Sequence, residues 1–229
     1  MQYTIRRAKT PPALDSGWDG PSWRDAEVAN ITNFYEKGSD HKPQTAAKVL
    51  YDDSGIYLQF LNDDRYVKCV HTEPHTHVFK DSCNEFFVMP KPFEPGGHGG
   101  YFNIEMNCGG QMLHYYIEDW TLLGGGRFGK YTKIDPKDLA TIKIFHTLPT
   151  KIEEEIQEPT QWRLAYHVPN AFFEKFVGPL EKPSERRWRG NFQKCADGTS
   201  HPHWATWSPI VPNGPFHQPK FFGELKFET

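Results

Sequence analysis

The sequence predicts an all-β protein in which two antiparallel sheets pack as a sandwich, with one short helix and long loops. Three observations point to this fold class. Aromatic residues, which favour strands, make up 15% of the 229 residues. Glycine and proline occur 19 times each, as in a chain with many turns. Finally, short segments of alternating apolar and polar residues recur along the chain and indicate strands.

The first clear strands form a hairpin. Residues 48–51 and 56–61 are expected to be strands, because apolar residues alternate with their neighbours in the second of them. The intervening segment Asp52–Gly55 has the composition of a tight turn. A third strand is expected at 84–89, where Pro90 ends it and a long loop begins.

The strand expected at 101–107 has two different faces, because successive side chains of a strand point in opposite directions. The residues of its apolar face are Phe102, Ile104 and Met106. The residues of its polar face are Asn103, Glu105 and Asn107. The apolar face is expected in the core. The polar face is either in contact with solvent or turned to a ligand, since amides and carboxylates pair well with sugar hydroxyls.

The rest of the chain continues this pattern. Further strands are expected at 111–117, 140–147, 162–168, 190–196, 203–208 and 222–227. The short helix is expected over Ala171–Phe176, with Asn170 as its N-cap. The acidic run Glu153–Glu155 is expected to be a solvated turn.

Length and charge limit the classes of function. The chain is expected to form a single domain, residues 1–229. A net charge of −3 gives no attraction to nucleic acid or to an anionic membrane. No segment approaches the ~18 apolar residues of a membrane span. The first residues lack the apolar segment of a signal peptide, so we expect a cytoplasmic protein, or an extracellular or periplasmic one if a leader was removed.

Cysteine and histidine are the candidate metal ligands and redox groups. The cysteines are Cys69, Cys83, Cys108 and Cys195. None forms a C-x-x-C pair, so buried free thiols are expected, with two disulfides as the alternative. The clustered histidines are His71, His75 and His77, which His201 and His203 could join. Imidazoles at this spacing can hold a transition metal, but Pro74 interrupts the segment, and a loop of exposed histidines is favoured.

Catalytic motifs give little support for an enzyme. Gly124 to Lys130 nearly matches a phosphate-binding loop, but Tyr131 replaces the magnesium ligand and Asp135-Pro136 stands where a helix should run. No G-x-S-x-G segment is present, and no cysteine lies in the context of a nucleophile. The sequence therefore favours a binding protein over an enzyme.

Aromatic residues near the C-terminus are candidates for stacking on a ligand. Trp204 and Trp207 cannot both face the same side of a regular strand, so one is expected in the core and the other nearer a loop. Phe216 follows on a segment rich in glycine and proline.

Several motifs, in this order, resemble the family 9 carbohydrate-binding modules, and more closely the stand-alone members of that family. The motifs are Trp18-Asp19, YDDSGIYLQFLNDD (51–64), KDSCNEFFV (80–88), GGYFNIEMN (99–107), WRLAYHVP (162–169), RGNFQKC (189–195) and TWSPI…FHQPKFFGELKF (206–227). The resemblance covers the chain from about Trp18 to the end. It implies an immunoglobulin-like β-sandwich related to the DOMON superfamily.

The resemblance also implies a site. Xylanase-linked members hold the reducing end of cellulose or xylan between two tryptophans, bind structural calcium and do no chemistry. By motif, the clamp positions fall at Phe216 and near Val78 or Phe79, and a loop asparagine falls at Asn213. The sugar-binding arginine of the family falls at Asn103, with Glu105 two residues on. Both tryptophans and the arginine are thus replaced here. For calcium the oxygen ligands would be Asp52, Asp53, Asp63 and Asp64, with ordinary turn chemistry as the favoured alternative.

Together these observations predict a non-catalytic carbohydrate-binding protein with no certain cofactor, for which calcium is the one candidate. The expected sugar-binding residues are Phe79, Asn103, Glu105, Asn107, Trp207, Asn213 and Phe216. One alternative is a glycan-active enzyme that uses the histidines or the Glu105 face. The other is a haem-binding electron-transfer module of the DOMON type, with Met106 or Met112 paired with His114 or His77.

Overall fold

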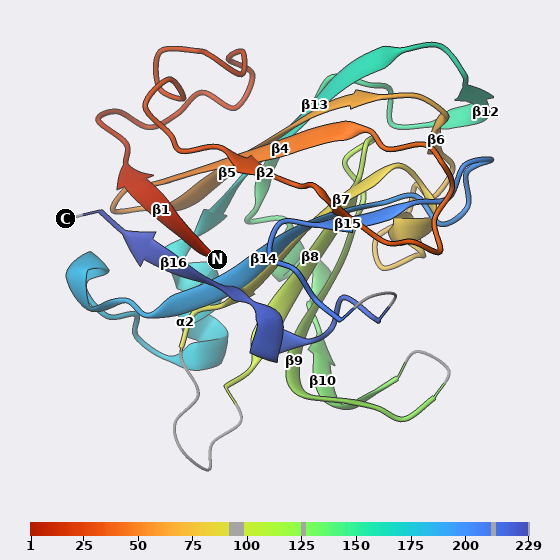
Figure 1. The fold of residues 1–229 in the computed structure, drawn as a ribbon. Coiled ribbons are helices and arrows are strands. Elements are labelled where there is room, and N and C mark those ends of the chain that lie inside the picture. The colour runs from red at the N-terminus through yellow and green to blue at the C-terminus, as the bar shows by residue number, and fades with distance from the viewer. Residues whose placement is uncertain (92–98, 125–126, 212–213, 229) are drawn as a thin grey trace.

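Most strands lie in one large curled sheet (Figure 1). The structure is a computed structural model that describes residues 1–91, 99–124, 127–211 and 214–228. The strands are β1 (Gln2–Arg7), β2 (Ala29–Asn30), β3 (Asn33–Phe34), β4 (Gln44–Tyr51), β5 (Gly55–Asp64), β6 (Val67–Cys69), β7 (Cys83–Met89), β8 (Tyr101–Asn107), β9 (Met112–Leu122), β10 (Phe128–Lys133), β11 (Lys143–His146), β12 (Ile152–Ile156), β13 (Thr160–Pro169), β14 (Trp188–Cys195), β15 (Trp204–Thr206) and β16 (Gly223–Phe227). The order across the sheet is β10-β9-β8-β7-β14-β16-β1-β4-β5-β13-β11. Expected strands such as 84–89, 101–107 and 162–168 are confirmed within one or two residues.

Strand β1 joins the two halves of the sheet, and it corrects the expected pair of separate antiparallel sheets. Its first residues pair in parallel with β16, from Gln2 opposite Glu224 to Ile5 opposite Phe227. Its last residues pair in parallel with β4. The sheet is therefore single and mixed, and it curls so that the β4-β5-β13 half faces the β7-β8-β14 half. This strand was missed because its flanking residues are polar and basic.

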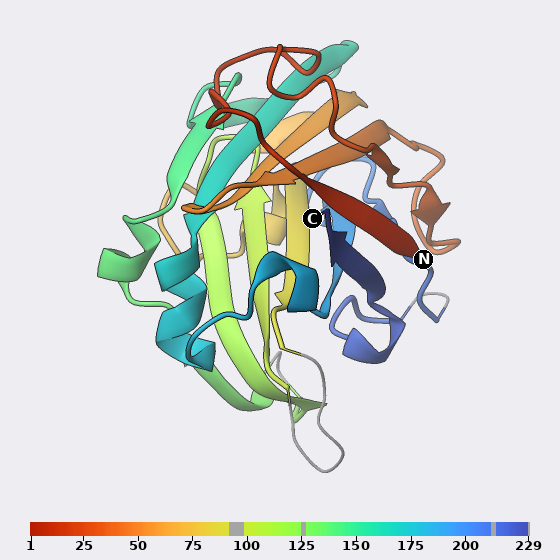
Figure 2. The same ribbon diagram turned by 90° about the vertical axis from the view of Figure 1, so that its left-hand side faces the viewer.

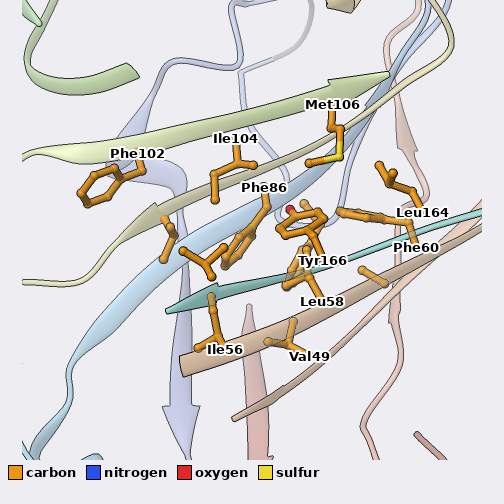
Figure 3. Close-up of a cluster of buried hydrophobic side chains, with 14 of the residues drawn as sticks. Val49, Ile56, Leu58, Phe60, Phe86, Phe102, Ile104, Met106, Leu164 and Tyr166 are labelled. Atoms are coloured by element: carbon orange, nitrogen blue, oxygen red, sulfur yellow. The ribbon is translucent and has the colours of Figure 1, made fainter. Parts of the chain in front are cut away.

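The main core fills the space between the two halves (Figure 3). Apolar side chains from β4, β5 and β13 meet side chains from β7 and β8 there. The labelled members are Val49, Ile56, Leu58, Phe60, Leu164 and Tyr166 on one side and Phe86, Phe102, Ile104 and Met106 on the other. All are buried, which confirms the expected inner face of the strand at 101–107. The polar residues of that strand consequently point to the outer face of the sheet.

Short helices cover the open sides of the curled sheet. They are α1 (Pro136–Leu139), α2 (Asn170–Val177) and the 3₁₀ turns η1 (Val78–Lys80), η2 (Pro183–Glu185) and η3 (Pro219–Phe221). Figure 2 shows α2 beside one open side of the curled sheet. Its Phe172 and Phe173 belong to the buried core. Asn170 is the first helical residue and not the expected N-cap, and its amide instead donates to the carbonyl oxygen of Asp53. The expected single helix is thus one of two.

Three local expectations have clear outcomes. The turn Asp52–Gly55 is confirmed, since the Asp52 carboxylate accepts hydrogen bonds from the backbone N–H groups of Ser54 and Gly55. The acidic run Glu153–Glu155 is not a turn but lies in β12, which pairs with β6 in a small second sheet. The strand expected at 140–147 begins only at Lys143, because Asp135 caps α1 just before it.

Two further expectations concern the cysteines and the helices. All four cysteines are buried free thiols in this part of the chain, as expected. Among the described residues, no helix is both long and apolar enough to cross a membrane.

Candidate functional site

A cavity of about 480 Å³ lies on the outer face of the β7-β8-β9 region, on the opposite side of the sheet from the main core. Its volume is within the range of small-molecule sites, roughly 300–1,000 Å³. Strand side chains form its floor, namely Glu85, Asn103, Glu105, Leu113, Tyr115 and Cys195. Loops, η1, β10 and the start of β15 form its walls, with Tyr35, Lys37, His77, Phe79, Arg127, Phe128, Tyr131, Asp197, Trp204 and the segment Gly214–His217.

The floor is polar because the outward positions of β7 and β8 carry carboxyls and an amide. Glu85 lies directly opposite Glu105 in the β7-β8 pairing. The amide of Asn103 donates to Glu105 Oε1 over 2.7 Å, and its carbonyl oxygen accepts from the backbone N–H of Tyr115. Asn103 therefore fixes the orientation of Glu105 from the side.

Burial changes the protonation of both carboxyls. The pKa of Glu105 is raised to about 8, because burial disfavours its charge and Asp197 adds repulsion, while the bond from Asn103 opposes the shift. The pKa of Glu85 is also raised well above its ordinary value, by burial first and then by Cys195 and Glu105. The raised pKa favours the protonated form of Glu105, which can both donate and accept a hydrogen bond.

Aromatic rings line the walls of the cavity. The indole N–H of Trp204 donates to Asp197 over 2.7 Å, which fixes the ring. Phe216 packs edge-on against Tyr35, with ring centroids 5.6 Å apart. Rings held in this way offer flat apolar surfaces whose orientation is set before a ligand arrives.

His217 forms the side of the cavity nearest Glu105. Its Nδ1 lies 2.7 Å from the hydroxyl oxygen of Tyr101, and its Nε2 lies 4.0 Å from Glu105 Oε1. Burial lowers its pKa to about 3, so the ring is neutral and can exchange hydrogen bonds in either direction.

The structure brings some of the expected sugar-binding residues together and places others elsewhere. Phe79, Asn103, Glu105 and Phe216 all line the cavity. Asn107 does not, because its amide donates to the carbonyl oxygen of His71 and to Asp81.

One tryptophan lies in the core and the other nearer a loop, as expected. However, the one in the core is Trp207, which was expected to bind the sugar. Trp207 is 4% exposed and packs on Tyr3 and Phe192 in the core. Trp204 lines the cavity in its place. Asn213 lies outside the described residues.

Several cavity residues were missed by sequence reasoning. Glu85 and Tyr115 occupy outward positions of strands that were expected, so the alternation that selected Glu105 could have selected them too. Asp197, Arg127 and Lys37 lie outside regular strands and carry no comparable signal.

The expected transition-metal histidines do not meet at one point. His71 pairs with Asp81, at 3.0 Å between Nδ1 and Oδ1. The Nε2 of His75 lies 2.9 Å from the carbonyl oxygen of Ile134, while His77 turns toward the cavity. His201 stacks on Tyr66.

Two of the expected calcium residues, Asp63 and Asp64, already have partners in the protein. Asp63 accepts a hydrogen bond from Gln161, whereas the side chain of Asp64 is fully buried. The carboxylate of Asp64 faces the ammonium of Lys194 at 3.2 Å and His41 Nε2 at 2.8 Å, and it accepts from the backbone N–H of Arg65. A lysine thus already occupies the position in which a cation would balance this charge.

The expected haem ligands also lie in unsuitable positions. Met106 and His114 are inner-face residues of neighbouring strands in a filled core, where His114 stacks on Phe172. Two ligands on the same face of a sheet cannot approach one iron from opposite sides. His77 lies on the other side of this sheet, in the cavity wall.

Comparisons with known proteins give a family and a fold. Residues 23–227 match the family model described as carbohydrate-binding family 9. A protein of Bacteroides uniformis described as a candidate carbohydrate-binding protein is 26% identical, with a TM-score of 0.81 over 99% of both chains. No curated protein matches this chain.

Two structures of family 9 modules from Caldicellulosiruptor kristjanssonii share the fold at lower identity. The module in complex with cellotriose is 12% identical, with a TM-score of 0.59 over 100% of this chain and 94% of the module. The module in complex with glucose is 14% identical, with a TM-score of 0.56 over 98% and 95% of the two chains.

Proposed function

The chain belongs to carbohydrate-binding family 9, and on that premise we propose that it binds an oligosaccharide or polysaccharide, without transforming it, in the cavity on the outer face of β7 and β8. Strands from both ends of the chain, β1 and β16, pair within the same sheet. We accordingly treat residues 1–229 as one binding domain.

One observation carries this proposal: the cavity combines fixed aromatic rings with buried hydrogen-bonding groups. A pyranose ring has an apolar face that stacks on aromatic rings and a rim of hydroxyls, each of which donates one bond and accepts others. Trp204, Phe79 and Phe216 supply the stacking surfaces. Glu105, as a neutral acid, supplies both a donor and an acceptor at the floor.

The shape of the cavity favours a chain end over the middle of a chain. Its floor is a continuous sheet, and walls rise from β10, η1 and the segment Gly214–His217. A terminal sugar can enter such a cavity while the rest of the chain stays outside. A cavity of this form is consistent with glucose and cellotriose, which are bound in the structures of similar family 9 modules.

A calorimetric screen tests this function. The panel consists of oligosaccharides from xylan, cellulose and mannan and of host-type glycans, each measured with and without calcium. We expect at least one micromolar ligand whose affinity does not depend on calcium. If that ligand is a reducing end, reduction of its terminal sugar to the alditol will abolish binding. A panel without any binding would contradict the proposal.

The Glu85–Glu105 pair favours one second candidate, a glycosidase, because such enzymes use two carboxyls on either side of a bond. A retaining or inverting enzyme needs one of the two carboxyls ionised as nucleophile or base. Burial instead raises the pKa of both. Binding without hydrolysis therefore fits better, and release of new reducing ends from any panel substrate would reverse that choice.

A further inference from the structure

Two thiols and one carboxyl meet at the edge of the cavity floor. The Sγ atoms of Cys83 and Cys195 and a carboxyl oxygen of Glu85 all lie within 4.8 Å of one another. Within the described residues, no other group of three or more cysteine, histidine or acidic side chains lies so close together. All three side chains are buried.

Strand geometry brings these residues together. Cys83 and Glu85 are two positions apart on β7, so their side chains share the outer face of the sheet. Cys195 of β14 lies directly opposite Cys83 in the antiparallel pairing. The three side chains thus stand on rigid backbone and not on loops, which is the arrangement that holds a ligand set in place.

The hydrogen-bonding capacity of these three side chains is only partly used. Cys195 Sγ lies 3.1 Å from Glu85 Oε1, but the buried Glu85 Oε2 has no hydrogen-bond partner among the described residues. Cys83 Sγ makes a long contact, 3.7 Å, to the carbonyl oxygen of its neighbour Asn84 and also pairs with the thiol of Cys195. A buried oxygen without a partner is costly, and a bound cation would satisfy it.

Two further acidic side chains lie near Glu85. Glu105 lies opposite Glu85, and Asp197 lies close enough to repel the charge of Glu85. Both residues line the same cavity. A cation at the thiols would lower this repulsion.

We propose that Cys83, Glu85 and Cys195 form a binding site for one thiophilic divalent cation of the zinc class. Two thiolates and a carboxylate are a ligand set that zinc accepts, whereas calcium and magnesium prefer oxygen alone. Ligand atoms around a tetrahedral zinc lie roughly 3.5–4 Å apart, so small side-chain rotations close the observed group on the ion.

The stoichiometry of binding follows from this ligand set. Each thiol releases one proton to solvent when it becomes a zinc thiolate, and the protonated form of Glu85 releases one more when its carboxylate binds the metal. Glu85 and Cys195 line the cavity, so the fourth coordination position is open on that side to water. This proposal does not depend on carbohydrate binding.

Calorimetric titration of the full chain with zinc chloride tests the site, after reduction and removal of metals with a chelator. We expect one zinc per chain. Cys195→Ser and Cys83→Ser should weaken zinc binding by roughly a hundredfold or more, and Glu85→Gln by about tenfold. Cys108→Ser is the matched control, because Cys108 and Cys69 are a second pair of hydrogen-bonded buried thiols without a carboxyl in the group.

The outcomes are separable. No zinc uptake, equal uptake by Cys195→Ser, or loss of uptake in Cys108→Ser would each overturn the site. A count of free thiols in the unreduced, unfolded protein is the second measurement. Four thiols support a metal site, whereas two thiols in the natural protein that rise to three in Cys195→Ser would indicate a Cys83–Cys195 disulfide and overturn it. Circular dichroism of each variant identifies any that fails to fold, for which Cys195→Ala replaces the serine variant.

Discussion

Glu85 and Glu105 lie directly opposite each other on β7 and β8, and both carboxyls form part of the floor of one cavity. Two carboxylates in this position would repel each other, and burial makes the charge still less favourable. The structure therefore holds at least one of them as a neutral acid, which is a hydrogen-bonding group suited to an uncharged ligand. The proposed binding of carbohydrate depends on this pair of carboxyls and on the aromatic rings around it.

Removal of the Trp204 ring should weaken carbohydrate binding. We expect Trp204→Ala to lower the affinity for the best oligosaccharide at least tenfold, about 1.4 kcal/mol, because a fixed stacking surface is lost. Trp204→Phe should retain most of the affinity. Phe145→Ala, on the edge strand β11 at the other end of the sheet, is the control that should bind as the natural protein does. Equal loss in Phe145→Ala would assign the effect to general destabilisation.

Substitution of Glu105 should distinguish a neutral acid from a carboxylate. Glu105→Gln keeps one donor and one acceptor, so we expect its affinity to stay within about threefold of the natural protein. Glu105→Ala removes both and should cost about 1–3 kcal/mol of binding free energy. Calorimetry on the two variants measures this difference. A large loss in Glu105→Gln would show that the ionised carboxylate is the binding form.

The buried Asp64–Lys194 pair should govern acid stability. Burial alone would raise the pKa of Asp64, but Lys194, the hydrogen bond from His41 and the charge of His203 together hold it well below its ordinary value. A carboxyl with a lowered folded pKa stabilises above its unfolded pKa, about 3.9, and this stabilisation is lost as pH falls further.

We therefore expect Asp64 to add to the fall in the free energy of unfolding below about pH 4, beyond the loss that buried His203 and His217 cause from about pH 6.5 downward. Asp64→Asn should show a shallower decline, because the residue no longer titrates. Denaturant unfolding between pH 7 and pH 3 measures both slopes. Asp64→Ala leaves the ammonium of Lys194 buried without its partner and should cost about 3–5 kcal/mol at pH 7. If the free energy of unfolding falls with pH equally in the natural protein and in Asp64→Asn, the lowered pKa of Asp64 does not contribute to acid stability.

Calcium should not stabilise the protein through Asp64. The carboxylate already faces Lys194, His41 and the backbone N–H of Arg65. We expect the difference in melting temperature between the natural protein and Asp64→Asn to be the same with calcium as with a chelator. A calcium-dependent gain that Asp64→Asn removes would show that the ion displaces Lys194.

The sequence predicted the strands well because alternation is a local property. The outer face of β8, with Asn103 and Glu105, was identified in this way, and so was the turn that Asp52 fixes. The joining role of β1 was not predictable, because it depends on parallel pairing with β4 and β16, which are distant in the chain. Phe79 and Phe216, which the family motifs selected, line the cavity, but the motifs did not reveal how it is walled.

The remaining differences have similar causes. Alternation could not decide which of Trp204 and Trp207 faces the core, because β15 is only three residues long and its end changes direction. The group of Cys83, Glu85 and Cys195 depends on the register between β7 and β14, which no spacing along the chain records. The acidic residues 153–155 resembled a turn because β12 lies in a two-stranded sheet with little to bury.

A magnetic-resonance titration tests the central claim most directly. The indole N–H signals of an isotopically labelled protein are followed while the best oligosaccharide of the panel is added. We expect the Trp204 signal to shift and to saturate at the affinity found by calorimetry, while the buried Trp23 and Trp207 stay in place. Binding that leaves the Trp204 signal unmoved would contradict the assignment of carbohydrate to this cavity.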